Sequence, residues 1–253
     1  MSSETKANVK RIQGTIPENG VAVSSYLLSK GYTYEQLYGY KKNGWIDEFG
    51  NGAYCKQGQH PSIEAAVDAL NHQAGLPLRI GARSALALDG FVHFIPMRRR
   101  KAYLYLKRGL ALPRWFAQKF AGQYLLSTTS FIAVDDGVSE QPTNGFSCLR
   151  SDPERAILEL LNLVPREVQL AECYQFFEMM ASLRASVVQN LLTHCSSVKA
   201  KRLFLMLAEE AGHPWLKRLD LSSVDLGSGC RMIDKGGSLE RKYNVVVKPW
   251  REI

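Results

Sequence analysis

Residues 24–56 read SSYLLSKGYTYEQLYGYKKNGWIDEFGNGAYCK. The stretch before Gly31 predicts a short helix that ends there, because glycine adopts the left-handed conformation that terminates helices. Residues 33–42 predict a second helix. Residues 45–55 predict two short strands joined through Gly50-Asn51-Gly52, which tolerate the positive φ angles of a tight hairpin. Helix, turn, helix and hairpin in this order are typical of a winged helix-turn-helix, a module that reads DNA.

The second helix of this segment is expected to enter the major groove with its N-terminal side chains facing the bases. Thr33 is expected to cap this helix, with Gln36 three residues later as in a capping box. Glutamine suits a bidentate contact with adenine, and lysines at the helix end suit phosphates. The predicted DNA contacts in this segment are Ser24, Ser25, Thr33, Tyr34, Gln36, Lys41, Lys42 and, at the hairpin tip, Asn51.

Composition sets the outer limits of the interpretation. The chain has 253 residues, a formal net charge of +8 and ordinary apolar and charged fractions, which favours a globular protein with an anionic partner. No apolar run reaches membrane-spanning length and no signal-peptide core follows Met1, so we expect a cytoplasmic protein without a membrane partner. Five scattered cysteines without a Cys-x-x-Cys pair argue against a disulfide framework and a zinc ribbon.

Periodicity along the rest of the chain predicts an α+β protein of two domains. Helices are expected at 62–74 and 82–88, strands at 102–106, 124–133 and 146–150, and four helices at 151–163, 167–181, 184–194 and 197–211. Short strands at 230–233 and 243–247 are expected to follow, with a turn at 235–238 between them. We place a winged helix-turn-helix with a helical extension at 1–95. A larger mixed domain, with a small sheet and a cluster of about four helices, follows at 96–253.

A central basic segment, residues 98–119, has eight basic side chains and no acidic one. Arg98, Arg99, Arg100 and Lys101 open it and are predicted to contact DNA phosphates, with salt-sensitive and sequence-independent affinity. Its aromatic residues are suited to stacking on unpaired bases. Two alternatives remain open: a solvated rim around a strand whose aromatics are buried, and a surface for an acidic protein partner.

The sequence has no catalytic signature, and we predict neither catalytic residues nor a metal or other cofactor. Asp135-Asp136 resembles a nuclease carboxylate pair, but aspartate before glycine is also what a turn prefers. Glu209-Glu210 with His213 is better explained as a solvated helix end. The glycines at 227–229 and 236–237 suit either a phosphate cradle or tight turns between strands, and turns are the simpler explanation.

Several motifs together resemble the AbiEi family, the antitoxins of bacterial type IV toxin–antitoxin systems. They are Gly44-Trp45, Gly52-Ala53-Tyr54, 151–160 (SDPERAILEL), 198–204 (VKAKRLF), His213-Pro214-Trp215, Arg218-Leu219-Asp220, 225–229 (DLGSG), Lys235-Gly236-Gly237 and Lys242-Tyr243. The resemblance implies a winged helix-turn-helix joined to a larger antitoxin domain. It also implies repression of the protein's own operon through inverted repeats in the promoter, and action against a nucleotidyltransferase-type toxin.

Our leading hypothesis is therefore a non-enzymatic repressor and antitoxin. It is expected to be a monomer when free, with two copies bound on double-stranded promoter DNA. The toxin is a functional partner whether or not the two proteins touch. A metal-dependent nuclease targeted by a winged helix, and a protein-binding adaptor whose winged helix never meets DNA, are the alternatives.

Overall fold

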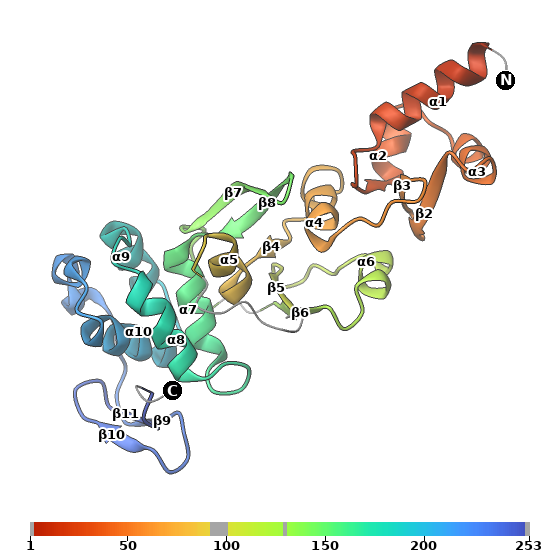
Figure 1. The fold of residues 1–253 in the computed structure, drawn as a ribbon. Helices are drawn as coiled ribbons and strands as arrows, with labels where there is room; N and C mark the ends of the chain where they lie inside the picture. The colour runs from red at the N-terminus through yellow and green to blue at the C-terminus, as the bar shows by residue number, and fades with distance from the viewer. Residues whose placement is uncertain (1–2, 92–100, 129–130, 251–253) are drawn as a thin grey trace. The chain divides into compact units, whose positions relative to one another are not determined.

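The structure, a computed structural model, describes residues 3–91, 101–128 and 131–250 of the chain (Figure 1). Within these ranges it contains ten α-helices, two short 3-10 helices and three small sheets. The predicted α+β class is confirmed. Arg98, Arg99 and Arg100 lie outside the described residues. By contacts between Cα atoms, the chain forms two compact units whose segments alternate along the sequence.

The first unit contains residues 1–79, 104–128 and 140–149. Its helices are α1 (Ser3–Thr15), α2 (Ser24–Ser29), α3 (Tyr34–Lys42), α4 (Ile63–His72) and α6 (Arg114–Lys119). Its own sheet has the order β1-β3-β2 and is antiparallel, with strands β1 (Ala22–Val23), β2 (Ile46–Gly50) and β3 (Ala53–Lys56). The predicted helix-turn-helix and hairpin are therefore present, and β1 adds a third strand.

The second unit contains residues 80–103, 129–139 and 150–253. Its helices are α5 (Ala82–Leu88), α7 (Pro153–Leu163), α8 (Leu170–Met179), α9 (Ala185–Thr193) and α10 (Val198–Glu210), with η1 (Pro214–Arg218) and η2 (Leu221–Ser223). Helices α7 to α10, coloured green to blue, gather in one cluster (Figure 1). The four helices predicted from 3.6-residue periodicity are confirmed. They cluster because each has an apolar face that is buried by packing against other helices.

Aromatic side chains fill the centre of this helical cluster. The rings of Phe177 and Phe204 lie 5.2 Å apart, and those of Phe204 and Trp215 lie 5.7 Å apart. His213 is buried, stacks on Trp215 and pairs with the carbonyl oxygen of Phe177. His213 is thus a core residue that joins α8 to η1.

A five-stranded sheet has the order β6-β5-β4-β8-β7. Its strands are β4 (Arg79–Ile80), β5 (Ala102–Tyr105), β6 (Tyr124–Ser127), β7 (Val138–Thr143) and β8 (Phe146–Ser151). The division between the two units passes through four of these strands, all except β6. The single boundary near residue 95 remains a sequence prediction.

The C-terminal sheet belongs to the second unit and has the order β10-β11-β9. Its strands are β9 (Arg231–Met232), β10 (Ser238–Glu240) and β11 (Val245–Val247), and β11 is parallel to β9 and antiparallel to β10. Two of these strands match the predicted ones at 230–233 and 243–247.

Several expectations about local structure were wrong. The predicted strand at 124–133 is too long, because β6 ends at Ser127 and Ile132 forms only an isolated bridge with Cys195. The sequence interpretation also missed α1, α6, β7 and β10. Of these, α1 had a readable signal, since Val9, Ile12 and Ile16 recur at helical spacing.

Candidate nucleic-acid interface

A buried cluster fixes the two helices of the helix-turn-helix in place. Leu27 of α2 and Leu37 of α3 are fully buried, and Ile46 of β2 completes the group from the wing, the hairpin β2–β3. Ile12 of α1 and Ile16, just after the helix, belong to the same cluster. Burying side chains of this size contributes about 1.5–3 kcal/mol each, so α1 is a structural part of the helix-turn-helix module.

The turn between the helices has the predicted chemistry. Gly31 has φ +85°, its N–H donates to Leu28 O (2.9 Å), and the Tyr32 N–H donates to Leu27 O (3.2 Å). This pattern is the Schellman end of a helix. Thr33 Oγ1 then accepts the Gln36 N–H (3.2 Å), and Gln36 Oε1 accepts the Thr33 N–H (3.0 Å). The predicted capping box is confirmed. It occupies the Gln36 Oε1 atom, which a bidentate contact with adenine would use together with the amide nitrogen.

The exposed face of α3 presents two tyrosines. Tyr34 and Tyr38 are 65% and 66% exposed, although tyrosine side chains are usually partly covered. They lie four residues apart and therefore on one face of the helix. Tyr38 was not among the predicted contacts; its spacing from Tyr34 was the signal that would have found it.

The two lysines that end α3 have different surroundings. Lys41 forms an ion pair with Glu48 of β2, and the hydrogen bond that its ammonium donates to Glu48 raises the pKa of Lys41. Lys42 is exposed and has no acidic partner among the described residues. Lys42 is therefore the lysine whose positive charge remains available to a phosphate.

The other predicted contacts lie around the wing. Asn51 is exposed at the hairpin tip, beside Gly52 with φ +87°. Ser25 is exposed at the start of α2, whereas Ser24 is half-buried. The Ser24 N–H donates to Gly52 O (2.9 Å) and its hydroxyl pairs with Tyr54 of β3, so Ser24 connects α2 to the wing.

Residues 104–128 pack against the wing within the same unit. The ring of Phe49, on β2, lies 6.0 Å from that of Trp115 and 5.9 Å from that of Phe120. A Cβ on Gly50 would come within 2.8 Å of Trp115 Cβ, so α6 and β2 meet where only glycine fits. The Lys119 ammonium lies 4.7 Å from the Phe49 ring centroid. Part of the central basic segment therefore adds positive charge beside the wing.

The aromatic residues of the central basic segment do not form a stacking platform. All four, namely Tyr103, Tyr105, Trp115 and Phe116, are at least 94% buried. The expectation that they could stack on unpaired bases was therefore wrong, because hydrophobic burial takes up their ring faces. The charged residues Lys107, Arg108, Arg114 and Lys119 are exposed, which fits a charged rim around buried aromatics. Lys101 is exposed too and belongs to the second unit.

The Asp135-Asp136 pair considered for a nuclease lies in a turn that α7 holds in place. Arg155 Nη1 donates to the carbonyl oxygens of Val134 (2.6 Å) and Asp136 (3.0 Å), and Gly137 has φ +71°. Asp135-Asp136-Gly137 is thus a turn clamped from α7. Across the described parts of the chain, no three His, Cys, Asp or Glu side chains are grouped as metal ligands would be.

The glycine-rich loop at 226–229 is organised by one buried arginine. Arg202 of α10 donates to the carbonyl oxygens of Leu226 (2.8 Å), Gly227 (3.1 Å), Gly229 (2.7 Å) and Asn244 (2.9 Å). The Gly227 N–H donates to Asp225 Oδ1 (2.7 Å). The loop therefore turns carbonyl oxygens towards a cation, which is the opposite of a phosphate cradle, and the turn interpretation is correct.

Two family models match nearly the whole chain. Residues 99–248 match "Transcriptional regulator, AbiEi antitoxin, Type IV TA system", and residues 5–97 match "Transcriptional regulator, AbiEi antitoxin N-terminal domain". The chain belongs to the AbiEi antitoxin family. The AbiEi assignment confirms the resemblance carried by the sequence motifs. It makes the protein a transcriptional regulator and antitoxin rather than an enzyme, with DNA and a cognate toxin as its partners.

A solved structure supports the fold of this AbiEi antitoxin. The crystal structure of the RV2827C protein from Mycobacterium tuberculosis aligns with 99% of this chain and 93% of its own, with a TM-score of 0.67 and 13% identity. At that identity the likeness concerns the fold alone. A search of curated proteins found no match. Among the described residues, no helix of the AbiEi chain is long and apolar enough to cross a membrane.

Proposed function

We propose that this AbiEi antitoxin represses its own toxin–antitoxin operon by inserting α3 into the major groove at inverted repeats in the promoter. Two copies bind, one on each half-site, because a repeat of opposite direction presents the same groove surface to each molecule. The protein acts in the bacterial cytoplasm, where its promoter lies. It also counteracts a toxin of the nucleotidyltransferase type.

The observation that carries this proposal is the exposed face of α3. Tyr34, Tyr38 and Lys42 extend along it, the capping box fixes the helix start, and the wing flanks it. Tyrosine rings offer apolar contact to thymine methyl groups and a hydroxyl for base edges, and Lys42 suits a phosphate. We therefore add Tyr38 to the predicted contacts Tyr34 and Gln36 as a reader of sequence.

Around that helix, other groups are assigned to the DNA backbone. Ser25, Asn51 and Lys119 are exposed on α2, the wing tip and α6, all within the first unit. Ser24 and Thr33 position the wing and α3 through their hydrogen bonds. Lys101 and the arginines at 98–100 are proposed to add sequence-independent affinity through phosphates.

Titration of the chain's own upstream DNA tests this function. Fluorescence anisotropy should detect salt-dependent binding of two protein molecules to a duplex with both repeats, and of one to a duplex with a single repeat. A scrambled duplex of equal length should bind more weakly by a factor of about 1,000 or more. Equal affinity for both duplexes, or no binding at low salt, would favour the adaptor hypothesis.

The antitoxin half of the proposal has its own test. Co-expression with the neighbouring nucleotidyltransferase should restore growth that the toxin alone arrests. A variant lacking Tyr34 and Tyr38 side chains should still restore growth when expressed from an independent promoter, because we assign those residues to DNA. Loss of rescue would assign α3 to toxin control instead.

A further inference from the structure

The outer face of the C-terminal sheet carries an apolar row. Val246 of β11 lies opposite Leu239 of β10 on one side and Met232 of β9 on the other. Cross-strand neighbours point to the same face, so these three side chains form one line across the sheet. Met232 is 71% exposed and Leu239 is 51% exposed. Val245 and Val247 alternate with Val246 and are buried, so the row is the face turned away from the core.

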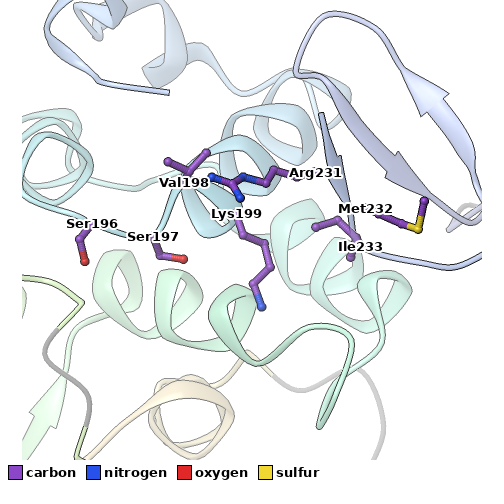
Figure 2. Close-up of a pocket in the computed structure, with 7 residues that line it drawn as sticks. All are labelled: Ser196, Ser197, Val198, Lys199, Arg231, Met232 and Ile233. Atoms are coloured by element: carbon purple, nitrogen blue, oxygen red, sulfur yellow. The ribbon is translucent and has the colours of Figure 1, made fainter. Parts of the chain in front are cut away.

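A pocket adjoins this apolar row (Figure 2). It has a volume of about 340 Å³ and lies between residues 196–199, at the start of α10, and residues 231–233, on and just after β9. Met232 belongs both to the pocket lining and to the row. Arg231 pairs with the buried Val245, so its side chain lies on the opposite face of β9 from Met232, and the pocket and the row meet at the edge strand β9 of the second unit (Figure 2).

The charged groups lining this pocket are both positive. They are Lys199 and Arg231, and none of the described residues that line it is acidic. The Lys199 ammonium donates to the carbonyl oxygens of Asn162 (2.7 Å) and Val164, which orient it without neutralising it. Burial lowers the pKa of Lys199, and the charge of Arg166 lowers it further.

The residues around this surface, 231–248, also carry a net positive charge. Residues 231–248 contain five basic and two acidic side chains. The two acids are engaged locally: Asp234 accepts the Lys248 N–H (3.1 Å), and Glu240 accepts the Tyr243 N–H (2.7 Å). Lys235, Arg241 and Lys248 are exposed and have no acidic partner among the described residues.

We propose that this surface docks an acidic segment of a partner protein. Apolar side chains of the partner cover Met232, Val246 and Leu239, and a carboxylate of the partner enters the pocket between Lys199 and Arg231. Methionine and arginine are both enriched at protein interfaces relative to the rest of the protein surface. The positive rim selects an acidic partner and speeds its association.

Charge and shape distinguish this occupant from others. A second copy of this chain would bring a positive surface against a positive surface, at a net charge of +8 per copy. Nucleic acid would match the charge but leave the apolar row without a complementary surface. An anionic lipid bilayer would match both, yet it would leave the pocket unused. The inference does not depend on the proposed promoter binding, which uses the first unit.

Peptide binding to the full-length protein tests the proposal. The probe is a short fluorescein-labelled peptide rich in glutamate and leucine, and its control has lysine at every glutamate position. The glutamate peptide should bind and the lysine peptide should not. Met232→Asp with Leu239→Asp should raise the Kd for the glutamate peptide about tenfold or more, as should Arg231→Glu. Matched controls are Leu221→Asp on η2 and Arg218→Glu on η1, which should leave the Kd unchanged.

Further measurements keep each outcome decisive. Thermal unfolding by circular dichroism should show that the variants fold; if the aspartate pair does not, Met232→Gln with Leu239→Gln replaces it. Affinity for a random-sequence duplex and for phosphatidylserine vesicles is measured with the same variants. Failure of the wild type to bind the glutamate peptide would overturn the proposal. A tenfold loss of duplex or vesicle binding on changing the row would also overturn it.

Discussion

Lys41, in the last turn of α3, forms an ion pair with Glu48 on the neighbouring strand β2. The pair places an acidic group beside the helix proposed to enter DNA and occupies one of its two terminal lysines. Glu48→Gln should therefore raise affinity for any duplex several-fold, because it frees Lys41 and removes a negative charge. The dependence of log K on log salt should steepen by about one unit. Lys42→Ala should flatten it by a similar amount, and an unchanged slope in both variants would contradict this geometry.

The exposed tyrosines of α3 should affect discrimination more than general affinity. Tyr34→Ala and Tyr38→Ala should each cost about 1–3 kcal/mol on promoter DNA and little on a scrambled duplex. Leu126→Ala, an exposed apolar position on β6, serves as the control and should change neither affinity. Equal losses on both duplexes would assign the tyrosines to the backbone.

The double role of Gln36 can be separated by two substitutions. Gln36→Ala keeps the Thr33 cap but removes the side-chain acceptor of the Thr33 N–H together with the amide donor, so it should cost about 0.5–1 kcal/mol of stability as well as promoter affinity. Gln36→Glu keeps a capping-box acceptor but lacks the amide donor. It should keep the melting temperature and lose the preference for promoter over scrambled DNA. If Gln36→Glu keeps that preference, Gln36 acts through the helix start alone.

A buried carboxylate predicts how stability responds to pH. Burial would raise the pKa of Glu154, but hydrogen bonds from Arg184 to its oxygens (2.8–3.0 Å) outweigh burial and lower that pKa. Glu154 therefore stabilises the fold above its unfolded pKa of about 4.3. This contribution disappears as the pH falls through the lower folded value.

Arg184→Ala should leave Glu154 buried without its cation. We expect a loss of about 2–3 kcal/mol at neutral pH, less than for a fully buried pair because the Arg184 side chain is 54% exposed. Burial without the cation raises the pKa of Glu154 in the variant, so urea unfolding should show the difference from wild type starting to shrink above the ordinary glutamate pKa of about 4.3 and continuing to shrink as the pH falls. A difference that is constant with pH would mean that Arg184 stabilises by packing.

Arg202 predicts the behaviour of the C-terminal sheet. Arg202→Ala would remove the Arg202 hydrogen bonds to the carbonyl oxygens of Leu226, Gly227 and Gly229 and to that of Asn244, which still accepts the Arg231 N–H (3.0 Å), at a cost of about 3 kcal/mol or more. Limited proteolysis should then cut within residues 225–248, whereas Lys217→Ala, at an exposed position, should leave the wild-type pattern. Resistance to cleavage in the Arg202 variant would show that β9–β11 is anchored by its apolar contacts.

Sequence patterns predicted those elements whose own residues carry the signal. Helices α7–α10 have apolar stripes, and the capping box depends only on Thr33 and Gln36, three residues apart. Strand β7 escaped because Glu140 and Pro142 resemble a loop; it lies at the sheet edge, where a proline without an N–H is tolerated. The ion pair at Lys41 and the packing of Trp115 on Phe49 join distant residues, which local periodicity does not specify.

The close approach of Gly50 to Trp115 also limits how DNA sequence preference can be transferred from one family member to another. The N-terminal family match ends at residue 97 and the second begins at residue 99. Trp115, which packs against Phe49 of β2, comes after that junction. A chimera joined at that point would keep the β2–β3 hairpin but lose its own Trp115, against which Phe49 and Gly50 pack. To transfer operator preference between family members, the helix-turn-helix, its hairpin and α6 must therefore be exchanged together. Natural recombinants should also keep these segments from one parent.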